Sequence, residues 1–116
     1  MALSADILRG YTDAIILRCL IQEDGYGYRI IKQVSLLSEG QVELKEPTLY
    51  TAFRRLESQG LIRSYWGDEQ TGARRRYYQL TDEGRARLAQ EQALWRQTRH
   101  TLDSLLLNTE EDEGHE

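Results

Sequence analysis

A helical segment followed directly by two short strands constrains the fold of this chain more than any other feature. Residues 47–59 carry apolar side chains at helical spacing. A proline lies in the first turn of this segment, and Gly60 follows its last turn. Proline sacrifices no hydrogen bond in the first turn, and glycine is favoured where the backbone turns left-handed after a helix. The segments 61–66 and 75–80 flank a polar, glycine-containing turn at 67–72, which predicts a β-hairpin.

Two further helices are expected before this segment. The first spans residues 5–22, where apolar side chains recur at helical spacing after Ser4, whose hydroxyl can cap a helix. The second helix spans residues 27–38, and its inward face is expected to hold Ile30, Ile31, Val34 and Leu37. After it, residues 42–44 alternate between apolar and charged side chains, which is typical of a very short strand.

A long last helix is predicted over residues 81–108, with Thr81 as its cap. Its apolar stripe recurs every seven residues and is too large for the core of one small domain to bury. Such a stripe favours a partner helix, and a two-fold homodimer is the commonest arrangement. The alternative is that this helix folds back on the first helix of its own chain. The stripe consists of Leu88, Trp95, Leu102, Leu105 and Leu106.

The predicted fold class is α+β, mainly α: a winged helix-turn-helix with a long C-terminal dimerisation helix. Residues 1–80 would form the winged helix-turn-helix DNA-binding domain, within which residues 5–22 would also contribute to the dimer interface. Residues 81–108 would form the dimerisation helix, and residues 109–116 an acidic tail that is predicted to be disordered.

Composition limits the location and the class of partner. A single cysteine excludes an internal disulfide and is typical of a reducing compartment. No apolar run is long enough to cross a membrane, and the N-terminus lacks the features of a signal peptide, so the cytoplasm is expected. The net charge is −4, but residues 41–80 carry seven Lys and Arg against five Asp and Glu. Because the local field attracts phosphate, this basic excess favours nucleic-acid binding by that segment.

The helix at 47–59 and the hairpin together predict a DNA-reading surface. Threonine can contact base edges or the thymine methyl, and arginine can bind guanine or phosphate. The alternative for the helix is an ordinary solvated polar face, and the alternative for the hairpin is a set of charges that protects a sheet edge from aggregation. The rival function for both together is a winged helix that binds another protein. The residues expected to contact double-stranded DNA are Lys45, Thr48, Tyr50, Thr51, Arg54, Arg55, Arg74, Arg75 and Arg76.

No pattern in the chain indicates catalysis. His100 and His115 have no partner at catalytic or metal-ligand spacing, and no phosphate-binding glycine loop is present. Neither an enzymatic activity nor a metal or cofactor is therefore expected.

Several short motifs occur together and in one order along the chain: Tyr26-Gly27-Tyr28 with Ile30-Ile31, Pro47 to Tyr50, Phe53 to Glu57, Gly60 to Ile62, Gly72 to Arg75, and Tyr77 to Thr81 with Gly84. In these motifs the chain resembles the PadR family of bacterial transcriptional regulators, particularly the short subgroup with one C-terminal helix. The resemblance extends from about Leu8 to Leu106 and implies a homodimeric winged-helix repressor. A two-fold dimer would present two reading helices to palindromic promoter DNA.

Tyr65-Trp66 followed by Gly67-Asp-Glu is similar to the multidrug-sensing members of that family. The resemblance implies that Trp95 stacks with its dimer mate on a planar aromatic ligand, which would release the repressor from DNA. Arg18 and Arg99 depart from a drug-binding pattern and favour an anionic or phenolic compound. The alternative for Trp95 is simple interface packing. The full set of candidate ligand contacts is Trp95, Ile7, Tyr11, Ala14, Arg18, Gln92 and Arg99.

The family usually has a cap-forming polar residue where Lys45 and Glu46 stand. Neither side chain is a good cap for the following helix.

Overall fold

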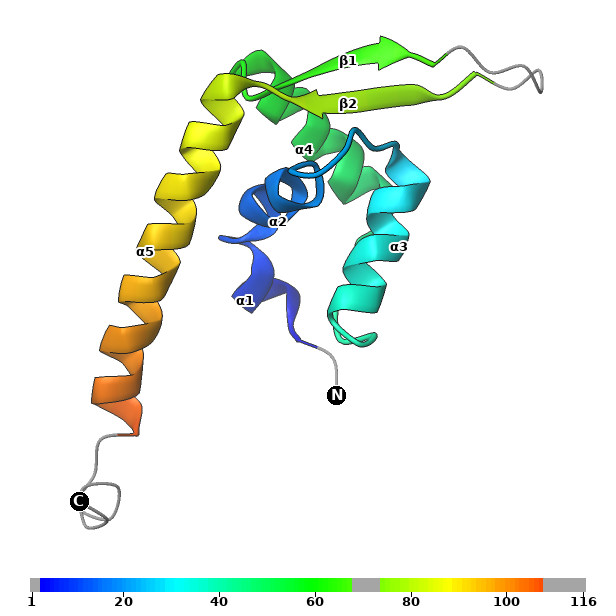
Figure 1. Cartoon of the computed structure of the whole chain (residues 1–116). Coiled ribbons are helices and arrows are strands. Elements are labelled where there is room, and N and C mark those ends of the chain that lie inside the picture. The colour runs from blue at the N-terminus through cyan, green and yellow to red at the C-terminus, as the bar shows by residue number, and fades with distance from the viewer. Residues whose placement is uncertain (1–2, 68–73, 108–116) are drawn as a thin grey trace.

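The computed structural model describes residues 3–67 and 74–107. The predicted fold class is confirmed, because these residues form a mainly helical structure with one antiparallel two-stranded sheet. Figure 1 shows α2, α3 and α4 gathered beneath the hairpin, while α5 runs away from them as a long arm. The elements are α1 (Ala5–Leu8), α2 (Thr12–Cys19), α3 (Gly27–Leu37), α4 (Glu46–Ser58), β1 (Ile62–Trp66), β2 (Arg76–Leu80) and α5 (Asp82–Leu106).

The prediction of one helix over residues 5–22 is wrong, because the chain forms two helices there. Ser4 caps the first, as expected, and its hydroxyl accepts a hydrogen bond from the Ile7 amide at 3.2 Å. The break falls around Gly10, a residue with low helix propensity, and the second helix ends at Cys19. α1 buries no residue, whereas α2 packs into the core with Ile16, Leu17 and Cys19.

α3 and the loop after it correct two further predictions. Ile30 and Val34 are buried as expected, but Leu37 is 66% exposed because it lies in the last turn of α3, beyond the core. Residues 42–44 form a loop rather than a strand. The Ser38 hydroxyl accepts a hydrogen bond from the Val42 amide at 3.0 Å, so a side chain satisfies this backbone group without a neighbouring strand.

α4 agrees with its prediction. Gly60 after the helix has a φ of 75°, in the left-handed region that favours glycine. The buried face stacks Phe53 on Tyr78 of β2 with ring centroids 3.7 Å apart, which joins α4 to the hairpin. That face is made by Leu49, Ala52, Phe53 and Leu56.

The hairpin and α5 complete the fold. β1 pairs with β2 in a register that sets Ser64 opposite Tyr78. Gly25, in the segment before α3, forms an additional antiparallel bridge with Tyr78. Thr81 caps α5 by accepting a hydrogen bond from the Gly84 amide at 3.0 Å, as predicted. The predicted disordered tail, 109–116, and most of the predicted turn, 67–72, lie outside the described residues. None of the helices within residues 3–67 and 74–107 is long and apolar enough to cross a membrane.

Candidate nucleic-acid interface and apolar pocket

α4 turns a polar face to the solvent. Thr48, Thr51 and Arg54 are exposed on it, and the Arg54 Nη2 lies 3.4 Å from the Thr51 hydroxyl. Lys45 occupies the N-cap position without a capping side-chain hydrogen bond, and its ammonium lies 3.1 Å from the Glu43 carboxylate. The helix therefore begins without a side-chain cap and continues with hydroxyl and guanidinium groups, a combination that suits phosphate and base edges.

Tyr50 lies on the flank of α4 that faces α3. Its phenol is so close to Gly27, the first residue of α3, that a methyl group at position 27 would overlap the phenolic oxygen. Its ring meets Phe53 edge to face, with centroids 5.5 Å apart. The side chain is still 39% exposed, so Tyr50 holds α4 against α3 and keeps part of its ring at the surface.

Arg55 lies on the other flank of α4 and is paired within the chain. Its Nε is 3.1 Å from one carboxylate oxygen of Asp13 in α2, and its Nη2 binds the other oxygen. The hydrogen bond to Asp13 raises the pKa of Arg55 above its ordinary value, so the guanidinium stays charged.

Two of the three predicted hairpin arginines meet one indole. The guanidinium carbons of Arg74 and Arg76 lie 5.2 Å and 5.6 Å from the Trp66 ring centroid, within cation–π range. Arg76 also donates to the Ser64 hydroxyl at 2.7 Å, and Ser64 donates to Glu57 of α4 at 2.6 Å. These contacts hold two cations in place on the hairpin and link it to α4.

The hairpin is also held by the segment that leads into α3. Arg75 lies over the Tyr26 ring at 4.6 Å, and Tyr26 meets Tyr77 edge to face. The Tyr65 hydroxyl donates a hydrogen bond to Asp24, which raises the pKa of Tyr65 to about 12. The same Asp24 oxygen accepts from Gln79 at 3.4 Å.

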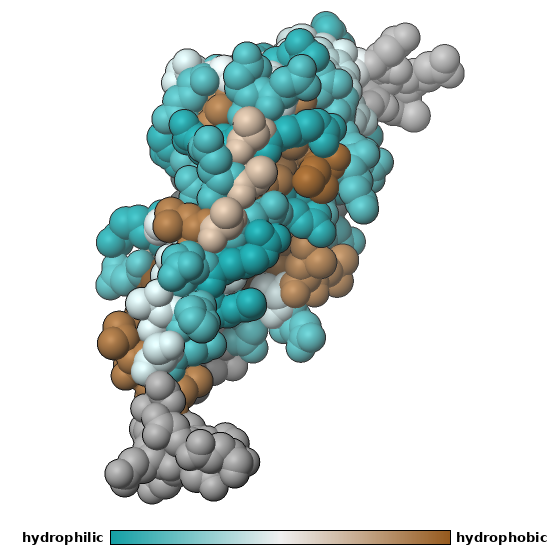
Figure 2. All heavy atoms as spheres, turned by 60° about the vertical axis from the view of Figure 1, so that its left-hand side comes forward, coloured by the Kyte–Doolittle hydropathy of each residue, from teal (hydrophilic) through white to brown (hydrophobic). Residues whose placement is uncertain are grey.

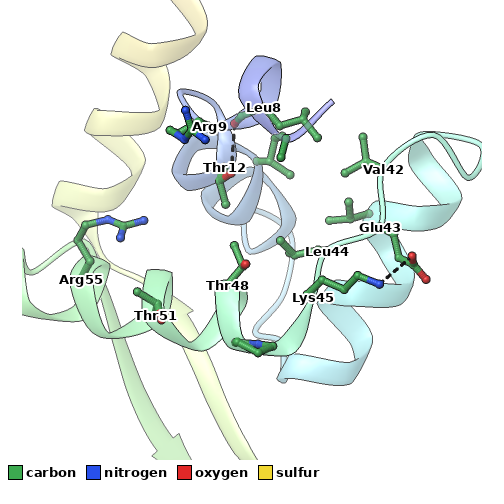
Figure 3. Close-up of a pocket in the computed structure, with 14 residues that line it drawn as sticks. Leu8, Arg9, Thr12, Val42, Glu43, Leu44, Lys45, Thr48, Thr51 and Arg55 are labelled. Carbon is green, nitrogen blue, oxygen red and sulfur yellow. Dashed lines mark hydrogen bonds and ion pairs between the residues drawn. The ribbon is translucent and has the colours of Figure 1, made fainter. Parts of the chain in front are cut away.

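A hollow of about 640 Å³ runs along α4. Figure 3 shows Thr48, Thr51 and Arg55 on one side of it, with Arg9, directly after α1, and Thr12 of α2 on the other. Its floor is apolar, from side chains that include Leu8, Ile15, Val34, Val42 and Leu44.

A second, more apolar pocket of about 800 Å³ lies between α1, α2 and α5. Trp95 lines it and meets Tyr11 edge to face, with ring centroids 5.4 Å apart. Of the predicted ligand contacts, all but Arg99 line this pocket: Ile7, Tyr11, Ala14, Arg18, Gln92 and Trp95.

Exposed apolar side chains continue from this pocket along α5. Leu94 is 60% exposed and Leu105 is 74% exposed. In Figure 2 hydrophobic atoms lie at the far end of α5, next to the grey C-terminus. Such surface is costly in water, and contiguous patches of it mark contact sites.

Comparison with known proteins identifies the family. Residues 16–90 match the transcriptional regulator PadR-like family. The chain belongs to this family. It is 41% identical to a transcriptional regulator from Clostridium thermocellum, with a TM-score of 0.81 over 88% of this chain and 99% of that one. It is 43% identical to a PadR family transcription regulator from Clostridium difficile R20291, with a TM-score of 0.75 over 84% of this chain and 99% of that one.

A third PadR family regulator, from Eggerthella lenta, is 34% identical, with a TM-score of 0.76 over 90% of this chain and 88% of that one. The family and its solved structures identify this PadR-like chain as a transcriptional regulator with a DNA-binding winged helix.

Sequence reasoning missed several residues that shape this PadR-like site. Asp13 pairs with Arg55. Asp24 accepts a hydrogen bond from Tyr65 of the hairpin. The Trp66 ring contacts the guanidinium groups of Arg74 and Arg76. No sequence signal marks the Asp13–Arg55 pair, because its members are 42 positions apart. Trp66 could have been found, since it precedes the turn whose far side carries the arginines.

Proposed function

We propose that this protein is a homodimeric repressor that binds palindromic promoter DNA through α4 and the β1–β2 hairpin. One observation carries the proposal: the exposed polar face of α4 adjoins a hairpin on which Trp66 holds Arg74 and Arg76. Fixed cations bind phosphate with a smaller loss of side-chain freedom, and a helix beside them can read base edges. The proposed DNA contacts are Lys45, Thr48, Tyr50, Thr51, Arg54, Arg74, Arg75 and Arg76. Arg55, the remaining predicted contact, is paired with Asp13 in the single chain.

We assign DNA binding and dimerisation to different parts of the chain, according to where the basic charge and the exposed apolar surface lie. Residues 1–80 form the DNA-binding domain, and residues 81–108 form the dimerisation helix, joined in the interface by residues 5–22. Support comes from α5, where Leu102 is 44% exposed and Leu105 is 74% exposed in the single chain. A second copy would cover this stripe, and the two-fold axis would set two α4 helices against the two halves of a palindrome.

The proposed effector is a planar aromatic or phenolic compound bound in the apolar pocket at Trp95. The pocket offers two aromatic faces, Tyr11 and Trp95, for stacking or edge contacts. Arg18 also lines it and would favour a phenolate or a carboxylate, while Glu91 lines it with the opposite charge. Occupancy of this pocket would lower the affinity for DNA.

The decisive experiment is a fluorescence-anisotropy titration of the full chain on the duplex upstream of its own gene, over a range of salt concentrations. Each phosphate contact contributes about −0.9 to the slope of log affinity against log salt. Replacing Arg75 and Arg76 together with alanine should therefore flatten the slope by about two contacts. Arg96→Ala is the matched control, because Arg96 is exposed on α5 outside the proposed surface.

Equal affinity for the upstream duplex and for a random duplex would contradict sequence-specific binding. An unchanged salt slope in the double variant would exclude the hairpin from the DNA contact. If both results occurred, a winged helix that binds another protein would be the better explanation.

The effector is tested by tryptophan emission in a Trp66→Phe background, where Trp95 is the remaining indole. Saturable quenching by one of a panel of anionic, neutral and cationic planar aromatics supports the pocket. No response in any class would leave Trp95 as an interface residue. Sedimentation velocity of the unmodified chain tests the dimer, and a monomer at all concentrations would contradict it.

A further inference from the structure

The contact between Asp13 and Arg55 joins α2 to α4 across 42 positions of sequence. The guanidinium uses two nitrogens, Nε and Nη2, and the carboxylate uses both of its oxygens. This is the bidentate geometry in which an arginine also binds a phosphate or the edge of a guanine. Asp13 therefore occupies the donors with which Arg55 would bind DNA.

The position of Asp13 favours its negative charge, and therefore its contact with Arg55. It lies in the first turn of α2, where the helix dipole favours a negative charge. Its side chain is 39% exposed and that of Arg55 is 44% exposed, so the pair lies at the surface rather than in the core. Surface pairs as a rule add little to folding stability, and a bidentate arginine–carboxylate pair is among the stronger ones, so a contribution to stability does not exclude a second role.

The neighbouring arginine is engaged differently. Arg54 is exposed, and its Nη2 approaches a hydroxyl, Thr51, at the long distance of 3.4 Å. α4 thus carries two consecutive arginines, of which one is paired with a carboxylate and the other with a weakly held hydroxyl.

We infer that Asp13 is a positioning residue that withholds Arg55 from DNA, so that α4 presents one arginine to the duplex rather than two. The inference rests on the proposed DNA-binding function. It makes Asp13 a determinant of affinity and specificity, because the release of Arg55 would add a cation at the flank of the recognition helix. Asp13 and Arg55 line a separate hollow, which shares Ala14 with the proposed effector pocket.

The test is a double-mutant cycle on the salt slope of DNA binding, with the full chain and its upstream duplex. Arg54→Ala should flatten the slope by about 0.9, the value of one phosphate contact, whereas Arg55→Ala should leave it unchanged. Asp13→Asn should steepen the slope by about 0.9, because an amide cannot hold the guanidinium through two oxygens. Asp13→Ser is a second variant, and serine is well tolerated at the start of a helix.

The combination of Asp13→Asn with Arg55→Ala separates release of Arg55 from the general loss of a negative charge. If Asp13 acts through Arg55, its replacement should have no effect on the slope in the Arg55→Ala background. An equal increase in both backgrounds would overturn the inference, and so would no increase with either Asp13 variant.

A second contradictory result is a slope flattened as much by Arg55→Ala as by Arg54→Ala, because Arg55 would then contact DNA already. If Arg54→Ala and the double change at Arg75 and Arg76 also leave the slope unchanged, the proposed DNA-binding function itself fails, and the inference with it.

Discussion

Gly84, in the first turn of α5, lies against the carbonyl group of Leu61, the residue that leads from α4 into β1. A side-chain carbon at position 84 would overlap that carbonyl oxygen and would also press on Leu80. The same oxygen accepts a hydrogen bond from the Thr81 amide at 3.1 Å, and the Thr81 hydroxyl donates to the Gly60 carbonyl at 2.7 Å. The close approach therefore fixes where the long helix leaves the winged domain.

Gly84→Ala should destabilise the protein by about 2–4 kcal/mol, because the added methyl group meets a backbone atom that cannot rotate away. The gain in helix propensity, about 1 kcal/mol, is too small to offset this. Urea unfolding measures the change. Gly10→Ala is the control, because nothing lies within 4 Å of a methyl group there. Equal midpoints for the two variants would contradict the close approach at Gly84.

Leu88→Ala should lower the free energy of unfolding by about 2–5 kcal/mol, because Leu88 is 2% exposed and its loss leaves a cavity. Leu36→Ala removes the same atoms from a helical leucine that is 74% exposed, and should cost about 0.5 kcal/mol or less. Chemical denaturation of both variants at one protein concentration makes the comparison. Similar losses would mean that a partner covers Leu36.

The tie between Tyr65 and Asp24 should depend on pH. The neutral phenol donates to the carboxylate, and this contact raises the pKa of Tyr65 to about 12 from an ordinary value near 10. The contact is therefore fully present below pH 10 and is lost as the pH rises through about 12. Phenolate absorbance of the wild type minus that of Tyr65→Phe isolates this group.

Asp24→Asn provides the control for that titration. Without the carboxylate, Tyr65 should ionise at a lower pH than in the wild type. An unchanged titration would show that another group raises the pKa of Tyr65.

Cys19 should react slowly with thiol reagents in the folded protein. Burial raises its pKa to about 11, so little thiolate exists near neutral pH. The reaction with a chromogenic disulfide measures the rate, and denaturation in urea should restore the rate of an ordinary thiol. Equal rates in the folded and denatured protein would contradict the burial of Cys19.

The sequence predicted best those elements whose ends carry local signals. Ser4 and Thr81 cap helices as expected, and Gly60 takes the left-handed conformation after α4. The predictions failed where a local pattern was incomplete. Apolar spacing continues across residues 5–22 although Gly10 interrupts the helix, and the alternation at 42–44 has no strand beside it.

The site was predicted unevenly for the same reason. Helical spacing separated the buried face of α4 from its polar face, but it could not reveal the partners of the polar side chains. Arg55 meets Asp13 from α2, and Tyr50 meets Gly27 from α3. On α5, Gln92 and Trp95 line the apolar pocket, whereas Arg99 lies outside it.

The sequence by itself determined the order of the helices and the hairpin, the caps, and the choice of core residues on α4, because these depend on backbone hydrogen bonds and apolar spacing over a few residues. Only the tertiary structure decided that Asp13 holds Arg55, that Trp66 holds Arg74 and Arg76, and that Tyr11 faces Trp95. Those pairings depend on distances in space between segments that are far apart in the chain, and packing of the core sets those distances.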